Sequence, residues 1–473
     1  LPAEGKLLSP RSAWCLVAVG NVAASSSPQN ASLLLPHVTQ HLHALHAFLK
    51  ADSLKPSMSS LVAFSPSSPS TTPRLAHRLH PSTSFESEAQ SGFGSNANGH
   101  GSHQLPLLLR AKGRATNSTA AEEFFAELTT ALLAAVAVHD VEHKAVFGPL
   151  VALVEAFDVS RPLHARMLAA MLAAMASAPS HACTVCLVPL STELLSFVAN
   201  LFCSLGDSLP LPVLGSLRSS LLQLANTLIL TSPNLQSTPE TAALYSAALA
   251  MVGSAKSSRV AHPAAVTLLA TIGCAQPAKT RAVFDTLVDV LDEPVEPSAL
   301  SMAQTLAVLD AVLAGLARLT AVSRTLRRGF VAQLQDVLFS RWFMAALSFS
   351  TPHKGDEALR KRVTAALANG LLDTHGALPD SAVALLSAFV LELASRVTEL
   401  MAAATAPRPT GTPASDTSLS TSLGTFFIAL LGDVAVRFGV PSVSKVVLNH
   451  FVSSLDTADD DSTFAGPIVA ALT

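Results

Sequence analysis

The chain has 473 residues, of which 49% are apolar and 13% charged, and its formal net charge is −3. At roughly 100–200 residues per domain, this length allows two to four domains or one extended repeat architecture. Such an apolar composition excludes a chain that is disordered throughout, because enough surface can be buried to offset the entropy of folding. The near-neutral charge argues against a nucleic-acid partner, since neutralising phosphates supplies most non-specific affinity.

The first segment, residues 1–64, is expected to form the N-terminal helices of the array. It begins Leu1-Pro-Ala-Glu-Gly-Lys, without a basic stretch followed by an apolar one, so no signal peptide is predicted. The missing initiator Met suggests a piece of a longer protein. Five cysteines in so long a chain do not indicate a disulfide framework, so a reducing compartment, cytoplasmic or nuclear, is expected.

Two segments interrupt the helical pattern. Residues 65–117 are rich in Ser, Pro and Gly and are expected to be a disordered insertion, because they hold few large apolar side chains. Residues 406–418 contain three prolines and a glycine, which predicts a flexible loop. The segments 118–405 and 419–473 are predicted to carry the helical repeats.

Within these repeats the apolar residues recur at helical spacing. One example is the set Val383, Leu386, Val390, Leu393, Val397 and Leu400. Thr238-Pro239-Glu240 supplies an N-cap, a proline at the first helical position and an early acid. Helix starts are also predicted near Pro162, Pro277, Pro379 and Pro441, and near residues 36 and 149. Strand signals are scarce, so the fold class is predicted to be all-α.

The predicted helices start about 15–30 residues apart, so that pairs recur every 40 residues or so. Leu163–Ala176 is apolar nearly all round and needs cover on both sides, which a two-layer stack provides. The stretch Leu287–Pro297 resembles the turn inside a HEAT repeat, and Gly355–Leu367 resembles the start of a second HEAT helix. This resemblance implies an α-solenoid of antiparallel helix pairs, a HEAT/ARM-like superhelix, without indicating a particular member.

The apolar stretches are not expected to span a membrane. Glu193 divides residues 185–205, and Asp310 and Arg318 interrupt residues 300–319, whereas a span needs about 20 mostly apolar residues. Trp and Tyr, which anchor spanning helices at the headgroups, number only two and one.

The sharpest chemical motif is His139-Asp-Val-Glu142-His143, an H-x-x-E-H sequence. On one helix, two such histidines can bind Zn²⁺ while the Glu activates a water. The motif resembles that of the insulinase-type metallopeptidases, which implies a third carboxylate ligand several tens of residues further on. Glu155 is too near for this role, and Glu193 and Glu240 have no supporting motif, so a polar turn at the end of a helix is the preferred interpretation.

Other candidate ligands also lack support. His181, Cys183 and Cys186 have no second cluster to complete a zinc site, so the thiols are read as core residues. The histidines of one helix (His37, His41, His43 and His46) point to different sides. Ser442-Val-Ser-Lys445 stands without the motifs that accompany a Ser-x-x-Lys nucleophile. No catalytic residue, metal site or cofactor is therefore predicted.

One electrostatic feature remains: residues 318–362 contain nine Lys and Arg but three acidic residues. Stacked repeats would align some of these side chains in a basic groove for acidic or phosphorylated protein segments. The residues proposed for this groove are Arg324, Arg327, Arg328, Arg341, Trp342, Arg360, Lys361 and Arg362.

The function that these observations favour is a non-catalytic protein–protein interaction scaffold or adaptor. The first alternative is the helical scaffold region of a larger enzyme, such as a ubiquitin ligase or kinase, or of a nuclear transport receptor. A more remote alternative is a zinc hydrolase built on His139, Glu142 and His143.

Overall fold

The structure is a computed structural model of the whole chain. It describes residues 17–22, 28–53, 117–139, 143–178, 187–206, 209–253, 262–292, 302–338, 355–373, 375–405, 415–457 and 464–472. Within these ranges the chain is all-helical and contains no β-strand, which confirms the predicted fold class. Residues 65–116 of the predicted insertion lie outside the described residues, whereas Asn117, its last predicted residue, already belongs to a helix.

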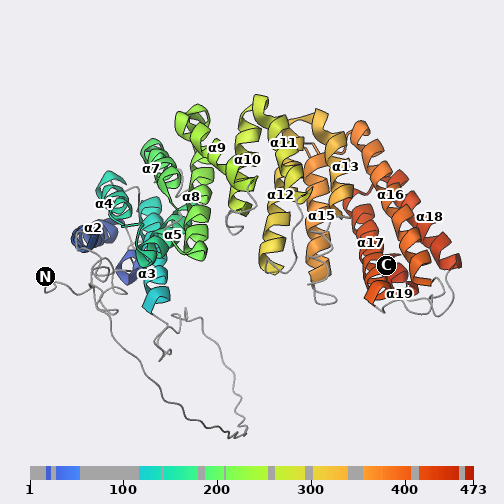
Figure 1. The fold of residues 1–473 in the computed structure, drawn as a ribbon, viewed down its shortest axis with the longest axis horizontal. Coiled ribbons are helices and arrows are strands. Elements are labelled where there is room, and N and C mark those ends of the chain that lie inside the picture. Colours follow the sequence, from blue (N-terminus) through green and yellow to red (C-terminus); the bar gives the residue numbers. More distant parts are fainter. Residues whose placement is uncertain are drawn as a thin grey trace, which may run out of the picture.

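The helices form two rows along an arc (Figure 1). The inner row contains α3 (Asn117–His139), α5 (Pro162–Ala176), α8 (Leu211–Thr231), α10 (His262–Ala275), α12 (Met302–Val322), α15 (Gly355–Leu371), α17 (Ser415–Phe438) and α19 (Ala465–Leu472). The outer row contains α2 (Pro28–Ser53), α4 (His143–Glu155), α7 (Ser191–Ser204), α9 (Pro239–Val252), α11 (Pro277–Asp292), α13 (Arg327–Leu338), α16 (Asp380–Thr405) and α18 (Pro441–Thr457). Short 3₁₀ turns precede three outer helices: η3 (Val188–Leu190), η4 (Pro233–Ser237) and η7 (Arg324–Leu326).

Helix packing distinguishes the two rows. Each inner helix contacts the next inner helix along the whole series from α3 to α19. Outer helices pack less continuously: α2 contacts α4, α7 contacts α9, and α16 contacts both α13 and α18, whereas α4 and α7 hardly touch. The inner row therefore forms the continuous spine of the molecule, and the outer row leaves gaps between some neighbours.

Several helix starts predicted at prolines are confirmed, and at α9 a polar cap accompanies the proline. At α9 the Thr241 amide donates to the Thr238 hydroxyl at 3.3 Å, and Pro239 is the first helical residue. Pro162, Pro277 and Pro441 likewise begin α5, α11 and α18. Pro379 stands one residue before α16.

Two predicted starts are wrong. Pro36 lies inside α2, which begins at Pro28, and Pro149 lies inside α4, which begins at His143. A proline within a helix removes a backbone hydrogen bond and crowds the preceding residue. In α4 the preceding residue is Gly148, which has no Cβ to press against the ring, so the helix can continue.

Small residues allow the inner helices to approach one another closely. A Cβ on Gly273 would lie 2.8 Å from Leu319 Cδ2, and one on Gly315 would lie 2.8 Å from Leu287 Cδ1. Buried faces of α10, α11 and α12 meet at these two glycines. The Ala-rich helix α5 buries nine of its fifteen residues, as expected of a helix covered on more than one side.

α17 begins at Ser415, so the last four residues of the predicted 406–418 loop belong to a helix.

Successive inner helices begin 40 to 60 residues apart, which is a wider and less regular spacing than the 40 residues suggested by the sequence.

Candidate partner-binding surface

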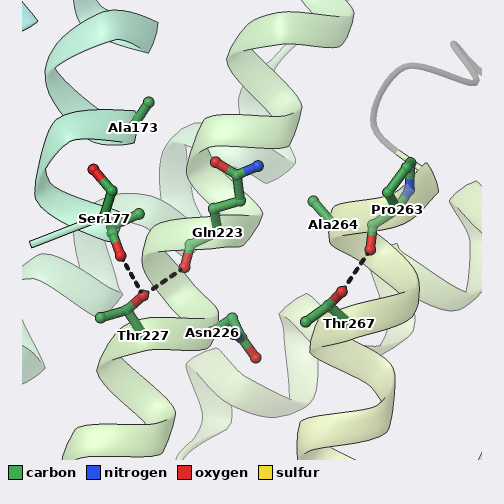
Figure 2. A pocket seen from close by; sticks show the side chains of 9 residues that line it. Ala173, Ser177, Gln223, Asn226, Thr227, Pro263, Ala264 and Thr267 are labelled. Atoms are coloured by element: carbon green, nitrogen blue, oxygen red, sulfur yellow. Dashed lines mark hydrogen bonds between the residues drawn. The ribbon is translucent and has the colours of Figure 1, made fainter. Parts of the chain in front are cut away.

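The inner row carries a groove of about 340 Å³ where three neighbouring helices meet (Figure 2). Its lining comes from α5 (Ala173, Ala176 and Ser177 just beyond its end), from α8 (Gln223, Asn226 and Thr227) and from the start of α10 (Pro263, Ala264 and Thr267). The groove exists because α5 and α10 present mainly methyl-sized side chains toward the longer polar side chains of α8. It lies on the exposed side of a row whose other side is buried.

Hydroxyl groups of this groove are already satisfied by the helices themselves. Thr227 Oγ1 lies 3.0 Å from the Ala176 carbonyl oxygen and 3.1 Å from that of Gln223 (Figure 2). Thr267 Oγ1 donates to the Pro263 carbonyl oxygen at 2.8 Å. The Thr227 contact joins α8 to the end of α5, so it stabilises the helix packing as well as the wall of the groove.

Amide groups remain for a partner. Thr271 Oγ1 lies 2.6 Å from Asn226 Oδ1, which holds the Asn226 side chain between α8 and α10. The exposed Gln223 side chain makes one long hydrogen bond, 3.4 Å from its Nε2 to Ser219 Oγ. A primary amide can donate and accept, and none of the described residues that line the groove is ionisable. This surface is therefore suited to binding a polar backbone rather than to acid–base catalysis.

The residues proposed for a basic groove fall on both rows. Arg324 is in η7, and Arg327 and Arg328 begin α13 in the outer row, while Arg360, Lys361 and Arg362 lie on α15 in the inner row. Arg324 and Arg328 are exposed, whereas Arg327 is buried and its Nε has no hydrogen-bond partner. Arg341 and Trp342 lie outside the described residues.

The α15 cations have partners within the chain. Arg360 Nε lies 2.9 Å from Asp433 Oδ2 on α17, and Arg362 Nε lies 2.9 Å from Asp310 Oδ1 on α12. Lys361 pairs with Glu357 of the same helix. Burial raises the pKa of the Asp310 carboxyl, and the Arg362 charge lowers it in part. Arg360 and Arg362 thus join α15 to both of its inner-row neighbours.

The H-x-x-E-H motif is divided between two helices. α3 ends at His139 and α4 begins at His143, so neither described helix carries the whole motif, and residues 140–142 lie outside the described residues. Across the described ranges, no three His, Cys, Asp or Glu side chains gather where they could hold a metal ion.

The remaining candidate residues lie on separate elements. Cys183 and Cys186 lie outside the described residues, and Cys203 is an exposed free thiol. On α2, His37 and His43 are exposed and His46 is half-buried. Ser442 is the exposed second residue of α18.

Sequence reasoning missed the inner groove, although a signal for it exists. Gln223, Asn226 and Thr227 recur at three- and four-residue spacing within the otherwise apolar segment of α8. Such a polar stripe marks the solvent-facing side of a buried helix.

No protein-family model, curated protein or solved structure matches this chain.

Among the residues that the structure describes, three helical segments are long and apolar enough to cross a membrane: Leu211–Thr231, Asp380–Ala402 and Thr421–Phe438. These segments are not the stretches 185–205 and 300–319 that were considered as membrane spans in the sequence. Neighbouring helices bury 61%, 39% and 50% of the most apolar parts of these segments. The absence of a membrane span stays a prediction.

Proposed function

We propose that the chain is a non-catalytic protein-interaction scaffold whose helix pairs form an α-solenoid of the HEAT/ARM type. The two-row arrangement and the 40- to 60-residue spacing of inner helices support this architecture. In such a stack each helix pair contacts mainly its neighbours, and the spine offers an extended surface to partners.

The observation that carries the proposal is the groove between α5, α8 and α10. It offers the side-chain amides of Gln223 and Asn226, and the described residues that line it include no charged group. These groups suit the backbone carbonyls and amides of an extended protein segment, which need hydrogen-bond partners when they leave water.

Affinity capture with the purified full chain tests this proposal. A variant with Ser177→Arg and Gln223→Arg fills the groove with two long cationic side chains at exposed positions. We expect it to lose a defined set of partners identified by mass spectrometry.

The matched control carries Ala388→Arg and Ser395→Arg, which add the same charge to exposed positions of α16. The control is expected to retain the partners that the wild-type chain captures. Capture of the same proteins by both variants would refute binding at this groove.

A further inference from the structure

A second groove, of about 700 Å³, lies on the outer row between α4, α7 and α9. It is lined by Glu155 at the end of α4, by Thr192, Glu193, Ser196, Phe197, Asn200, Leu201 and Ser204 of α7, and by Glu240 at the start of α9. The groove is open because α4 and α7 hardly contact each other. Within the part of the chain that the structure describes, no helix covers this face of α7.

The floor of this groove is apolar. Phe197 and Leu201 pack partly against the core and are only half-buried, so part of each side chain faces the groove. They stand four residues apart on α7, one helical turn, and form a short apolar stripe. From Thr192 to Ser204 the exposed face of α7 runs for about 18 Å, the length of roughly three turns of a second helix.

The rim of the groove is negative. Glu155, Glu193 and Glu240 line it, and the described residues that line this groove include no Lys, Arg or His. None of the three forms an ion pair within the described part of the chain. Their charges are therefore free to meet those of a partner.

The three carboxylates differ in their positions on the helices. Glu193 and Glu240 lie in the first turns of α7 and α9, where the helix dipole favours a negative charge. Glu155 is the last residue of α4, where the dipole disfavours it, so a cation beside Glu155 is favourable. Lys50 and His46 line a separate hollow between α2 and α4, and Glu155 lies at the border of both hollows. On the α7 side of Glu155, the charged residues described in the lining are all acidic.

We propose that this groove binds a basic amphipathic helix of a partner protein. The helix lies along α7 with its apolar stripe on Phe197 and Leu201, and its Lys or Arg side chains face the three glutamates. An apolar floor with an acidic rim complements such a helix in both respects, and a groove of three turns matches its length. This inference does not depend on the inner-row groove and adds a second surface with a partner of different chemistry.

Fluorescence anisotropy with the full chain tests the inference. The probe is a labelled peptide of about 14 residues in which Leu recurs at helical spacing on one face and Lys occupies the other. We expect saturable binding that weakens at least tenfold in a variant with Glu155→Gln, Glu193→Gln and Glu240→Gln, because three charge pairs are lost together. Raising the salt concentration should also weaken binding to the wild-type chain.

The matched control carries Asp336→Asn, Glu392→Gln and Glu399→Gln, which change the net charge equally at exposed positions of α13 and α16. It should bind the probe within twofold of the wild-type affinity, and a probe with Ser in place of Leu should bind at least tenfold more weakly. The Ser177→Arg, Gln223→Arg variant should bind the probe normally, which separates this surface from the inner groove. Far-UV circular dichroism checks that each variant is folded.

Equal loss of binding in the two charge-neutralised variants would show that the probe senses net charge alone and would overturn the proposal. The same conclusion follows if the probe does not saturate, or if the Ser-containing probe binds as well as the original.

Discussion

The contact between Gly370 of α15 and Phe330 of α13 allows a quantitative test of the packing between the rows. A Cβ on Gly370 would lie 2.5 Å from Phe330 Cε1 and 2.9 Å from its Cδ1. Phe330 is fully buried, so its ring cannot move into solvent to make room. The substitution Gly370→Ala therefore forces the two rows apart or moves the ring within a packed core.

Overpacking of this kind costs about 1–3 kcal/mol. Alanine also stabilises a helix relative to glycine by about 1 kcal/mol, which offsets part of the cost. The difference between these two contributions is about 0–2 kcal/mol, so we expect Gly370→Ala to lower the free energy of unfolding by up to about 2 kcal/mol. Gly329→Ala on α13 is the matched control, because its Cβ would meet Phe284 at an ordinary 3.7 Å. The control should gain stability by up to about 1 kcal/mol.

Urea denaturation followed by far-UV circular dichroism measures the change in stability. Hydrogen exchange with mass spectrometry of peptides from 327–338 and 355–371 locates it, because a stack of helices can unfold in segments. Adding Phe330→Leu removes the ring that the new methyl group would meet. The double variant should therefore be more stable than the sum of the two single changes predicts, by about 1 kcal/mol.

Equal stability of Gly370→Ala and Gly329→Ala would refute this reasoning. Strict additivity of Gly370→Ala and Phe330→Leu would refute it too, since it would show that the methyl group and the ring do not meet.

Three more measurements address a helix cap, a half-buried imidazole and the thiols. Thr238→Ala removes the N-cap of α9 and should destabilise the protein by about 1 kcal/mol, with faster hydrogen exchange at the start of that helix; unchanged exchange would contradict the cap. Burial lowers the pKa of His450 below its usual 6.5, so the unfolded chain binds the proton more readily and stability should fall as pH drops below 6.5. His450→Gln should reduce this loss of stability at low pH. If the free energy of unfolding of the variant depends on pH as in the wild-type chain, His450 is not its cause. Brief alkylation should modify the exposed Cys203 before Cys274, whose thiol pKa is raised by burial; the opposite order in peptide mapping would contradict these environments.

Local sequence signals account for much of the fold. Apolar residues at helical spacing identified α16, and the sequence Thr238-Pro239-Glu240 identified the first turn of α9, because both depend on neighbours within a few residues. Pro36 and Pro149 misled the same reasoning. A proline can begin a helix or stand inside one, and packing on both sides of it decides between the two.

The candidate surfaces depend on contacts distant in the sequence. Arg360 pairs with Asp433 across 73 residues, and Glu155, Glu193 and Glu240 come from three different helices to line one groove. In the sequence the arginines suggested a basic groove. Glu155 was considered too near the H-x-x-E-H motif to be its third ligand, and Glu193 and Glu240 had no supporting motif.

Composition and periodicity by themselves determined that this chain forms stacked apolar helices, because hydrophobic burial depends on which residues recur along each helix. Only the tertiary structure decided which charges are neutralised and which helix faces stay open. Ion pairing and groove formation depend on the distance between side chains brought together by packing, which local spacing does not encode.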